Sequence, residues 1–210
     1  IVAAARQGLV EVAPAIAESL GHSDATLAHV AYRGLSQLQS EKSAFSVFKN
    51  KQSSNGQKRG ASLALMRIHK KEVVDELLPM LSDHKNPLFK HSFEILARLY
   101  HKEKTWDRKH WGGRPDTRGP YYEMVTWEQS ERILTALREA LWSLSKDQVG
   151  EYLSLLGSNR IQDNETLNSL IESTKYDSSL IPVLSAQLSV LKDPPVNGLD
   201  VLASAPDKDK

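Results

Sequence analysis

One short pattern recurs three times and limits what this chain can fold into more than any other feature of its sequence. A small residue is followed by leucine four positions later and by leucine or isoleucine seven positions later. Offsets of four and seven place all three side chains on one face of an α-helix. The units begin 30 and 31 residues apart, a length that holds two helices and two turns. They comprise Ala31/Leu35/Leu38, Ala61/Leu65/Ile68 and Ser92/Leu96/Leu99.

Each of these helices has a predicted partner helix on its N-terminal side. The partners are expected at residues 12–20, 43–49 and 73–81. Because a single helical hairpin cannot bury its own apolar face, each hairpin must stack on the next. No sustained alternation with a period of two argues for strands. The sequence therefore predicts an all-α protein, a solenoid of helical hairpins that resembles HEAT-like and armadillo-like α-α superhelices.

Capping residues mark several of the expected helix ends. The predicted N-caps of the three repeated helices are Asp24, Ser54 or Asn55, and Asn86 in front of Pro87. Gly21 predicts that the first partner helix stops after residue 20, because glycine readily takes the left-handed conformation beyond a helix end.

Further helices are expected in the second half of the chain. Thr126 with Gln129, and Ser145 with Gln148, match the capping box, in which a Ser or Thr is followed three residues later by Glu or Gln. An apolar period follows each box, and two more helices fit residues 165–173 and 179–191. The tail, residues 192–210, contains Pro, Asn-Gly, Asp and Lys in a pattern typical of a linker or a disordered exit.

The regular pattern is interrupted by residues 102–126, named the inserted segment below. Its first 24 residues, 102–125, show no helical period, although structureless loops beyond roughly 12–15 residues are uncommon in compact domains. Aromatic and charged side chains are concentrated here and directly after it. The candidate interaction residues are Trp106, Trp111, Arg114, Asp116, Arg118, Tyr121, Tyr122, Trp127 and Glu128.

Two interpretations of this concentration remain open. Arginine binds carboxylates and phosphates through two parallel hydrogen bonds, and aromatic rings stack on other rings or on guanidinium groups, so the segment fits a recognition surface. Alternatively, the segment folds back onto the helices, its rings fill the groove between them, and Arg114 forms a local ion pair with Asp116. The turn-forming Gly112-Gly113 and Gly119-Pro120 suit both cases.

Residues 111–122 read WGGRPDTRGPYY, and Thr126-Trp127-Glu128 follow shortly after. This stretch resembles the W-G-x-R-P-D-T-x-G-P-Y-Y … T-W-E signature in the HEAT-repeat region of large bacterial PVC-type haem-binding CxxCH proteins, also described as membrane-bound dehydrogenases. The resemblance is specific over about residues 88–135. In that family a β-propeller of sugar-dehydrogenase type precedes the helical region and a c-type cytochrome module follows it.

The resemblance implies a periplasmic or otherwise extracytoplasmic redox protein, of which this chain is expected to be a fragment. Its partners would be neighbouring domains of the same polypeptide or another protein. Haem c would belong only to a neighbouring module, because a chain without cysteine has no site for covalent haem attachment. No catalytic role is known for the matching residues of the family, so none is carried over.

Charge is distributed unevenly along the chain. Residues 42–118 hold 17 basic and 8 acidic side chains, whereas residues 119–210 hold 8 basic and 14 acidic ones. A basic face of a helical solenoid can bind nucleic acid, and one class of alkylpurine DNA glycosylases has a similar architecture. The acids interspersed in the basic region make nucleic acid an unlikely partner and glycosylase activity the least favoured alternative. The basic positions concerned are Lys49, Lys51, Lys58, Arg59, Lys70, Lys71 and Arg67.

The remaining composition removes several classes of function. The absence of cysteine excludes disulfides, thiolate nucleophiles and Cys-ligated zinc from this chain. No apolar run approaches the ~18–20 residues that a membrane span needs. The seven histidines show no His-x-x-x-His spacing, although His84, His91, His101 and His110 could gather at a metal. We therefore expect no catalytic residues, metal or cofactor in this chain.

Taken together, the sequence predicts HEAT-like repeats over residues 1–101, the inserted segment over 102–126, further HEAT-like helices over 127–191 and the tail over 192–210. Because the helices after the inserted segment leave the 30-residue register, we expect two helical blocks joined at that segment. The expected function is a non-catalytic scaffold or interaction module. A module that binds nucleic acid or another anionic partner is the alternative.

Overall fold

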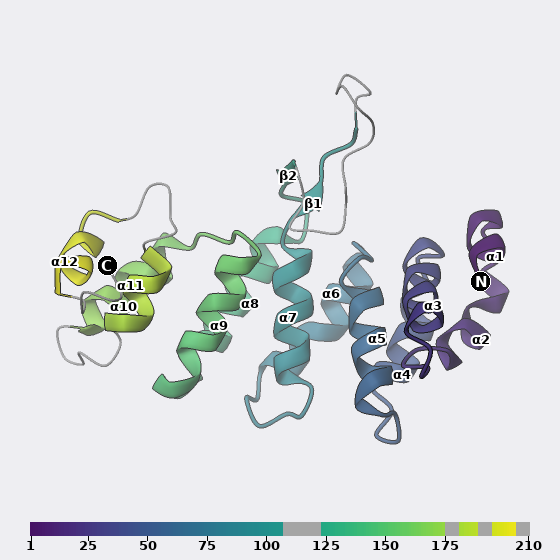
Figure 1. Ribbon diagram of the computed structural model, residues 1–210. Coiled ribbons are helices and arrows are strands. Elements are labelled where there is room, and N and C mark those ends of the chain that lie inside the picture. Colours follow the sequence, from purple (N-terminus) through teal and green to yellow (C-terminus); the bar gives the residue numbers. More distant parts are fainter. Residues whose placement is uncertain (107–122, 175–180, 189–194, 205–210) are drawn as a thin grey trace.

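Helices follow one another in chain order along the length of the molecule in the computed structural model, with α1 and α12 at opposite ends (Figure 1). The structure describes residues 1–106, 123–174, 181–188 and 195–204. Apart from one two-stranded ladder, the regular elements in these ranges are helices. The predicted all-α class is therefore confirmed.

Helices precede and follow the inserted segment, and two short strands lie within it. The first half contains α1 (Val2–Gln7), η1 (Val10–Val12), α2 (Ala13–Glu18), α3 (Ala25–Gln37), α4 (Glu41–Phe48), α5 (Asn55–Leu65), α6 (Lys71–Leu77), η2 (Leu78–Leu81) and α7 (Phe89–Leu99). The second half contains β1 (Lys102–Glu103), β2 (Met124–Val125), α8 (Ser130–Trp142), α9 (Lys146–Ser158), α10 (Asn164–Thr174), α11 (Ile181–Leu188) and α12 (Gly198–Ser204).

The three repeated sequence units lie on α3, α5 and α7, except that Leu38 is the C-cap of α3 and Ile68 lies just beyond the end of α5. Their nine side chains are all buried, and only Leu38 reaches 7% exposure. Along the chain α3 contacts α5, α5 contacts α7, α7 contacts α9 and α9 contacts α11, so these helices form one continuous layer. The periodic pattern thus identified side chains that are buried in the common core.

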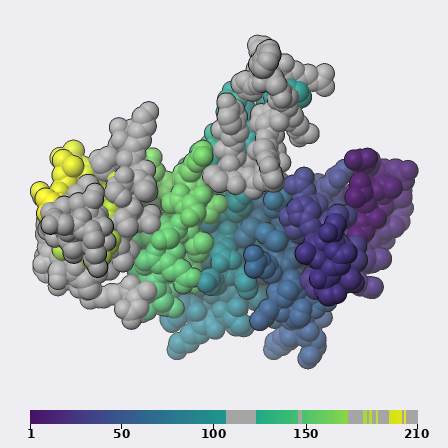
Figure 2. All heavy atoms as spheres, viewed as in Figure 1, coloured from purple at the N-terminus to yellow at the C-terminus, as the bar shows by residue number. Residues whose placement is uncertain are grey.

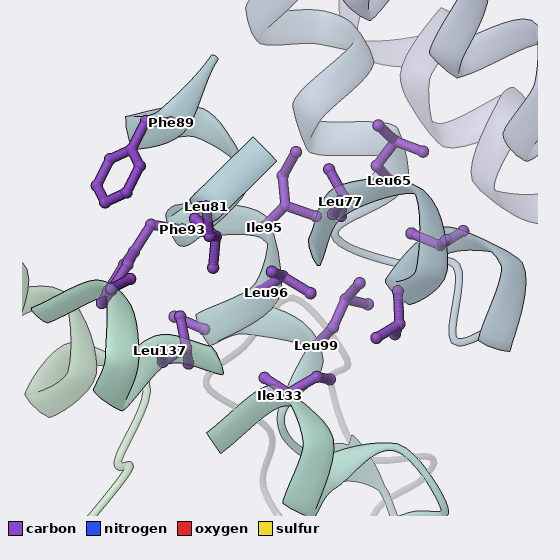
Figure 3. Packing of buried hydrophobic residues seen from close by; sticks show 14 of the residues in the cluster. Leu65, Leu77, Leu81, Phe89, Phe93, Ile95, Leu96, Leu99, Ile133 and Leu137 are labelled. Carbon is purple, nitrogen blue, oxygen red and sulfur yellow. The ribbon is translucent and has the colours of Figure 1, made fainter. Parts of the chain in front are cut away.

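Side chains from several elements converge on α7 in the centre of the molecule (Figure 3). Leu65 comes from α5, Leu77 from α6 and Ile133 from α8, and all three are fully buried. The apolar core also crosses from α7 to α9, where the rings of Phe93 and Tyr152 lie edge to face with centroids 4.8 Å apart. The helices expected as two blocks joined at the inserted segment therefore share one apolar core, which continues past that segment.

Most of the predicted caps of the first half are confirmed. Asp24 accepts hydrogen bonds from the first-turn amides of α3, and Ser54 rather than Asn55 caps α5. Ser54 and Gln57 also complete a reciprocal capping box. Asn86 does not cap α7, which begins at Phe89. Its Oδ1 instead accepts from the Leu88 amide at 2.9 Å in the preceding turn.

Gly21 has the predicted left-handed conformation, with φ of +74°. The preceding helix is shorter than expected, since η1 leads into α2 and α2 already ends at Glu18. A Cβ atom on Gly21 would lie 2.4 Å from the amide nitrogen of Gln57. Glycine is therefore required both by the turn and by the close approach of the first turn of α5.

In the second half two predictions need correction, whereas the helices expected at residues 165–173 and 179–191 are found as α10 and α11. Ser145 and Gln148 form the predicted capping box of α9. Thr126 does not cap α8, which begins at Ser130, three residues later than that cap implies. The tail is not wholly a linker, because residues 198–204 form α12 and bury Val201 against the core. Apolar contacts with α11 and α10 explain this helix, which the local composition concealed.

Candidate functional site

The two ends of the inserted segment meet in a short antiparallel ladder. Lys102 pairs with Val125 and Glu103 with Met124. One residue further on, the Lys104 amide donates to the carbonyl of Glu123 at 2.9 Å. Two-residue strands are too short to leave an alternating pattern in the sequence, which is why this ladder was not predicted. We name residues 99–106 and 123–130, which carry the ladder, the neck.

The neck projects from one edge of the row of helices, above α7 (Figures 1 and 2). Its outer part carries the exposed Lys104 side chain, which forms an ion pair with Glu123 at 2.5 Å. Glu103 Oε1 accepts the backbone amide of Glu123 at 2.9 Å. These contacts hold the two strands together through side chains as well as backbone.

Trp127 and Ser130 attach the neck to the C-terminal end of α7. Trp127 Nε1 donates to the carbonyl of Leu99 at 2.7 Å, and Ser130 Oγ donates to the carbonyl of Tyr100 at 2.7 Å. The last carbonyls of a helix have no partner within that helix. These two side chains therefore satisfy orphan carbonyls and fix the chain at the start of α8 in one position.

His69, which follows α5, joins the neck from the preceding repeat. Its Nε2 lies 2.8 Å from the carbonyl of His101, and its ring packs edge to face on Trp127 with centroids 5.3 Å apart. Burial, with the nearby cations Arg98 and Lys102, lowers the pKa of His69 to about 4, so the ring is neutral at pH 7. An uncharged imidazole thus links the neck to the chain that follows α5.

His101 is a second half-buried imidazole of the neck. Burial is the main cause that lowers its pKa, and Arg98 and Arg160 act in the same direction. A backbone hydrogen bond with Asn159 acts in the opposite direction. Its ring packs edge to face against Tyr100, with centroids 4.5 Å apart.

Three of the nine candidate residues named from the sequence lie in the described part of the chain. Trp127 is half-buried and anchors the neck to the Leu99 carbonyl, so it positions the segment. Glu128 is exposed. Trp106 is half-buried, and its buried Nε1 has no hydrogen-bond partner among the described residues. Outside the described residues lie Trp111, Arg114, Asp116, Arg118, Tyr121 and Tyr122.

Sequence reasoning missed the residues that hold the neck from outside the inserted segment. His69 stands directly after the second repeat unit, at the position that Tyr100 occupies after the third. That shared place in the repeat was the available signal. The pattern does not show which of several polar residues near a helix end reaches the neighbouring repeat, because the contact joins residues far apart in sequence.

Part of the basic character of the middle region is used in contacts between and within helices. Lys70 Nζ donates to Glu41 Oε2 at 2.7 Å and to the carbonyl of Gln39 at 2.6 Å. The Arg67 guanidinium lies over the ring of Tyr32, 5.4 Å from its centroid. Two more of the basic positions form the ion pairs Lys49–Glu76 and Lys71–Asp75. These pairs reduce the positive charge available to an anionic partner.

Within the described ranges, no three histidine or carboxylate side chains come together in a way that would hold a metal ion. His110, one of the four histidines considered for such a site, lies outside them. No helix of the described part of the chain is long and apolar enough to span a bilayer. No family model, curated protein or solved structure matches the chain.

Proposed function

We propose that this chain is a non-catalytic helical scaffold of the HEAT-like type, and that the inserted segment is its interaction element. The partner would be a neighbouring domain of the same polypeptide or another protein. The proposal places the chain in a larger extracytoplasmic protein of the c-type haem-binding, dehydrogenase-like kind that the segment resembles. Haem and any redox chemistry would belong to the neighbouring module.

The observation that carries this proposal is the anchoring of the neck. The chain that follows the inserted segment is fixed to the end of α7 that precedes it, by hydrogen bonds from Trp127 to Leu99 and from Ser130 to Tyr100. Binding elements are commonly loops positioned by a rigid scaffold, because the scaffold reduces the entropy lost on binding. A long insertion held at its base by specific hydrogen bonds fits this arrangement.

The row of helices supports the solenoid part of the proposal. Successive helices of one layer contact each other from α3 to α11, and α2 contacts α4 in the other layer. In a solenoid each hairpin contacts mainly its neighbours, so one position along the row can be modified while the others retain their packing. An insertion between α7 and α8 suits such a scaffold.

The family context is tested by the coding sequence beyond Lys210. A Cys-x-x-Cys-His within about a hundred residues, the spacing that attaches c-type haem, is the expected result. A stop codon directly after Lys210 contradicts the cytochrome context.

The interaction role is tested by binding of the adjacent cytochrome module to this chain, measured by calorimetry. Arg114→Ala combined with Asp116→Ala is expected to weaken binding at least tenfold without changing the free energy of unfolding. Asp83→Ala with Lys85→Ala is the matched control, since it removes the same two charges from the turn before α7. Equal binding by the two double variants contradicts the role of the segment.

The alternative is a module that binds nucleic acid, which the excess of 17 basic over 8 acidic side chains in residues 42–118 favours. It predicts that duplex DNA binds at low salt and that affinity falls steeply as salt rises, since binding releases counterions. Fluorescence anisotropy at two salt concentrations tests this, and absence of binding at the lower one rejects the alternative.

A further inference from the structure

The neck brings two neutral imidazoles close to positive charges. His69 comes from the end of α5 and His101 from the end of α7. Arg98 of α7 and Lys102 of β1 act on His69, and Arg98 and Arg160, which follows α9, act on His101. All of these charged groups are cations, so their effect on either ring opposes protonation.

The contacts of His69 are those that hold the neck on the preceding repeat. Its Nε2 bonds the His101 carbonyl at 2.8 Å, and its ring supports Trp127, whose own Nε1 bonds the Leu99 carbonyl at 2.7 Å. A charge placed on this half-buried ring loses hydration and is repelled by Arg98 and Lys102. The favourable response is for His69 to move to water, which withdraws support from Trp127.

We propose that the neck is an acid-released latch, in which uncharged His69 holds the β1–β2 ladder and Trp127 on α5 and protonation of His69 releases them. This regulation rests on the proposed function, since it would control how the inserted segment is presented to a partner. Its test is made on the free chain without a partner, so failure of the latch and failure of the interaction role are distinguishable.

The direction of the pH effect follows from the two states of His69. In the closed neck its pKa is about 4, and in the open neck it returns to the ordinary 6.5. The open form binds more protons between these values, so opening increases as pH falls from 6.5 to 4. From pH 7.5 to pH 5.0 this linkage raises the ratio of open to closed neck roughly 30-fold.

Amide hydrogen exchange on the whole chain, read by mass spectrometry, measures this opening. Protection factors, which correct for intrinsic exchange rates, are compared at pH 7.5 and 5.0 for peptides covering residues 99–106 and 123–130. The expected result is a tenfold or greater loss of protection in both. A peptide covering residues 58–65 of α5 should change less than threefold. Neck protection that is the same at both pH values overturns the proposal.

His69→Gln removes the titrating group and keeps an amide that can donate to the His101 carbonyl. Its neck protection is expected to lose most of its pH dependence, and His69→Gln with His101→Gln should lose all of it. His29→Gln is the matched control, because His29 is exposed and its Nδ1 lies 2.9 Å from the hydroxyl of the nearby Tyr32, away from the neck. An acid-induced loss that persists unchanged in both His69 variants overturns the proposal.

Discussion

The joints between helices differ on the two sides of Leu99. Before it, α3, α5 and α7 pack through the repeated apolar units, whose side chains are buried with few polar groups among them. Polar contacts join helices on both sides, for example Lys70 with Glu41 before Leu99, but the contacts to the end of α7 and a bidentate ion pair lie after it. Trp127 and Ser130 bind the end of α7, and Arg138 of α8 binds Asp163 in front of α10 through two hydrogen bonds of 2.8 and 2.9 Å.

The difference shows two ways of building the same row of helices. Apolar contacts between helices depend mainly on the volumes of the side chains that meet. The same small-x-x-x-Leu pattern can therefore be used again in each repeat. Polar contacts between helices depend on the direction of each hydrogen bond. They lose most of their contribution to stability if one partner is missing. The base of the inserted segment is held by contacts of the second kind, so it has a defined geometry.

The largest expected effect is on the apolar side of this comparison. Phe93→Ala removes a fully buried ring that packs on Tyr152 and Phe89, and it should lower the free energy of unfolding by about 4 kcal/mol. Urea denaturation followed by circular dichroism measures the loss. Leu199→Ala, at an exposed position, is the control and should cost less than about 0.5 kcal/mol. Similar losses for both variants would show that the core is not where the structure places it.

The next effect belongs to the polar side. Arg138→Ala leaves the buried carboxylate of Asp163 without its bidentate partner and should cost about 3 kcal/mol, measured by the same denaturation. The control is Arg132→Ala on the same helix, where the guanidinium pairs with the exposed Asp75. The loss of unfolding free energy in Arg132→Ala should be much smaller. If the two arginine variants are equally stable, the joint between α8 and α10 does not depend on this ion pair.

Two glycines with nearly the same backbone angle allow the stability cost of a steric clash to be measured apart from the cost of the backbone conformation. Gly8 and Gly21 have φ of +72° and +74°, but a Cβ at Gly8 meets nothing within 4 Å whereas one at Gly21 meets the backbone of α5. Gly8→Ala should cost about 1 kcal/mol from the left-handed conformation alone. Gly21→Ala should cost about 2 kcal/mol more, because α5 must shift. Thermal unfolding of the two variants gives the comparison, and equal costs would rule out the close approach.

The smallest effect tests the neck. Trp127→Phe keeps an aromatic ring beside His69 but leaves the Leu99 carbonyl without its donor, which should cost about 1 kcal/mol. Trp142→Phe changes a half-exposed ring at the end of α8 and is the matched control, with an expected change near zero. Chemical denaturation measures both. A neutral Trp127→Phe would mean that the hydrogen bond does not fix the neck.

Much of the helical framework was predictable because its signals are local. The +4 and +7 offsets identified the buried faces of three helices, and the Asp24, Ser54 and Ser145 caps marked where helices begin. The start of α8 was misplaced because Thr126 and Gln129 match a capping box while the chain there is held by Trp127 and Ser130 instead. A local rule gave way to contacts with α7.

The sequence by itself determined that this chain forms helical hairpins, which side chains they bury and where the regular pattern is interrupted. Only the tertiary structure decided how the interruption is held. The hydrogen bond between His69 and the His101 carbonyl spans 32 residues, and the one between Trp127 and the Leu99 carbonyl spans 28. Helix periodicity acts over a few residues, whereas these partners meet only after the hairpins have stacked. The neck is therefore a product of the packing, and no local pattern could have specified it.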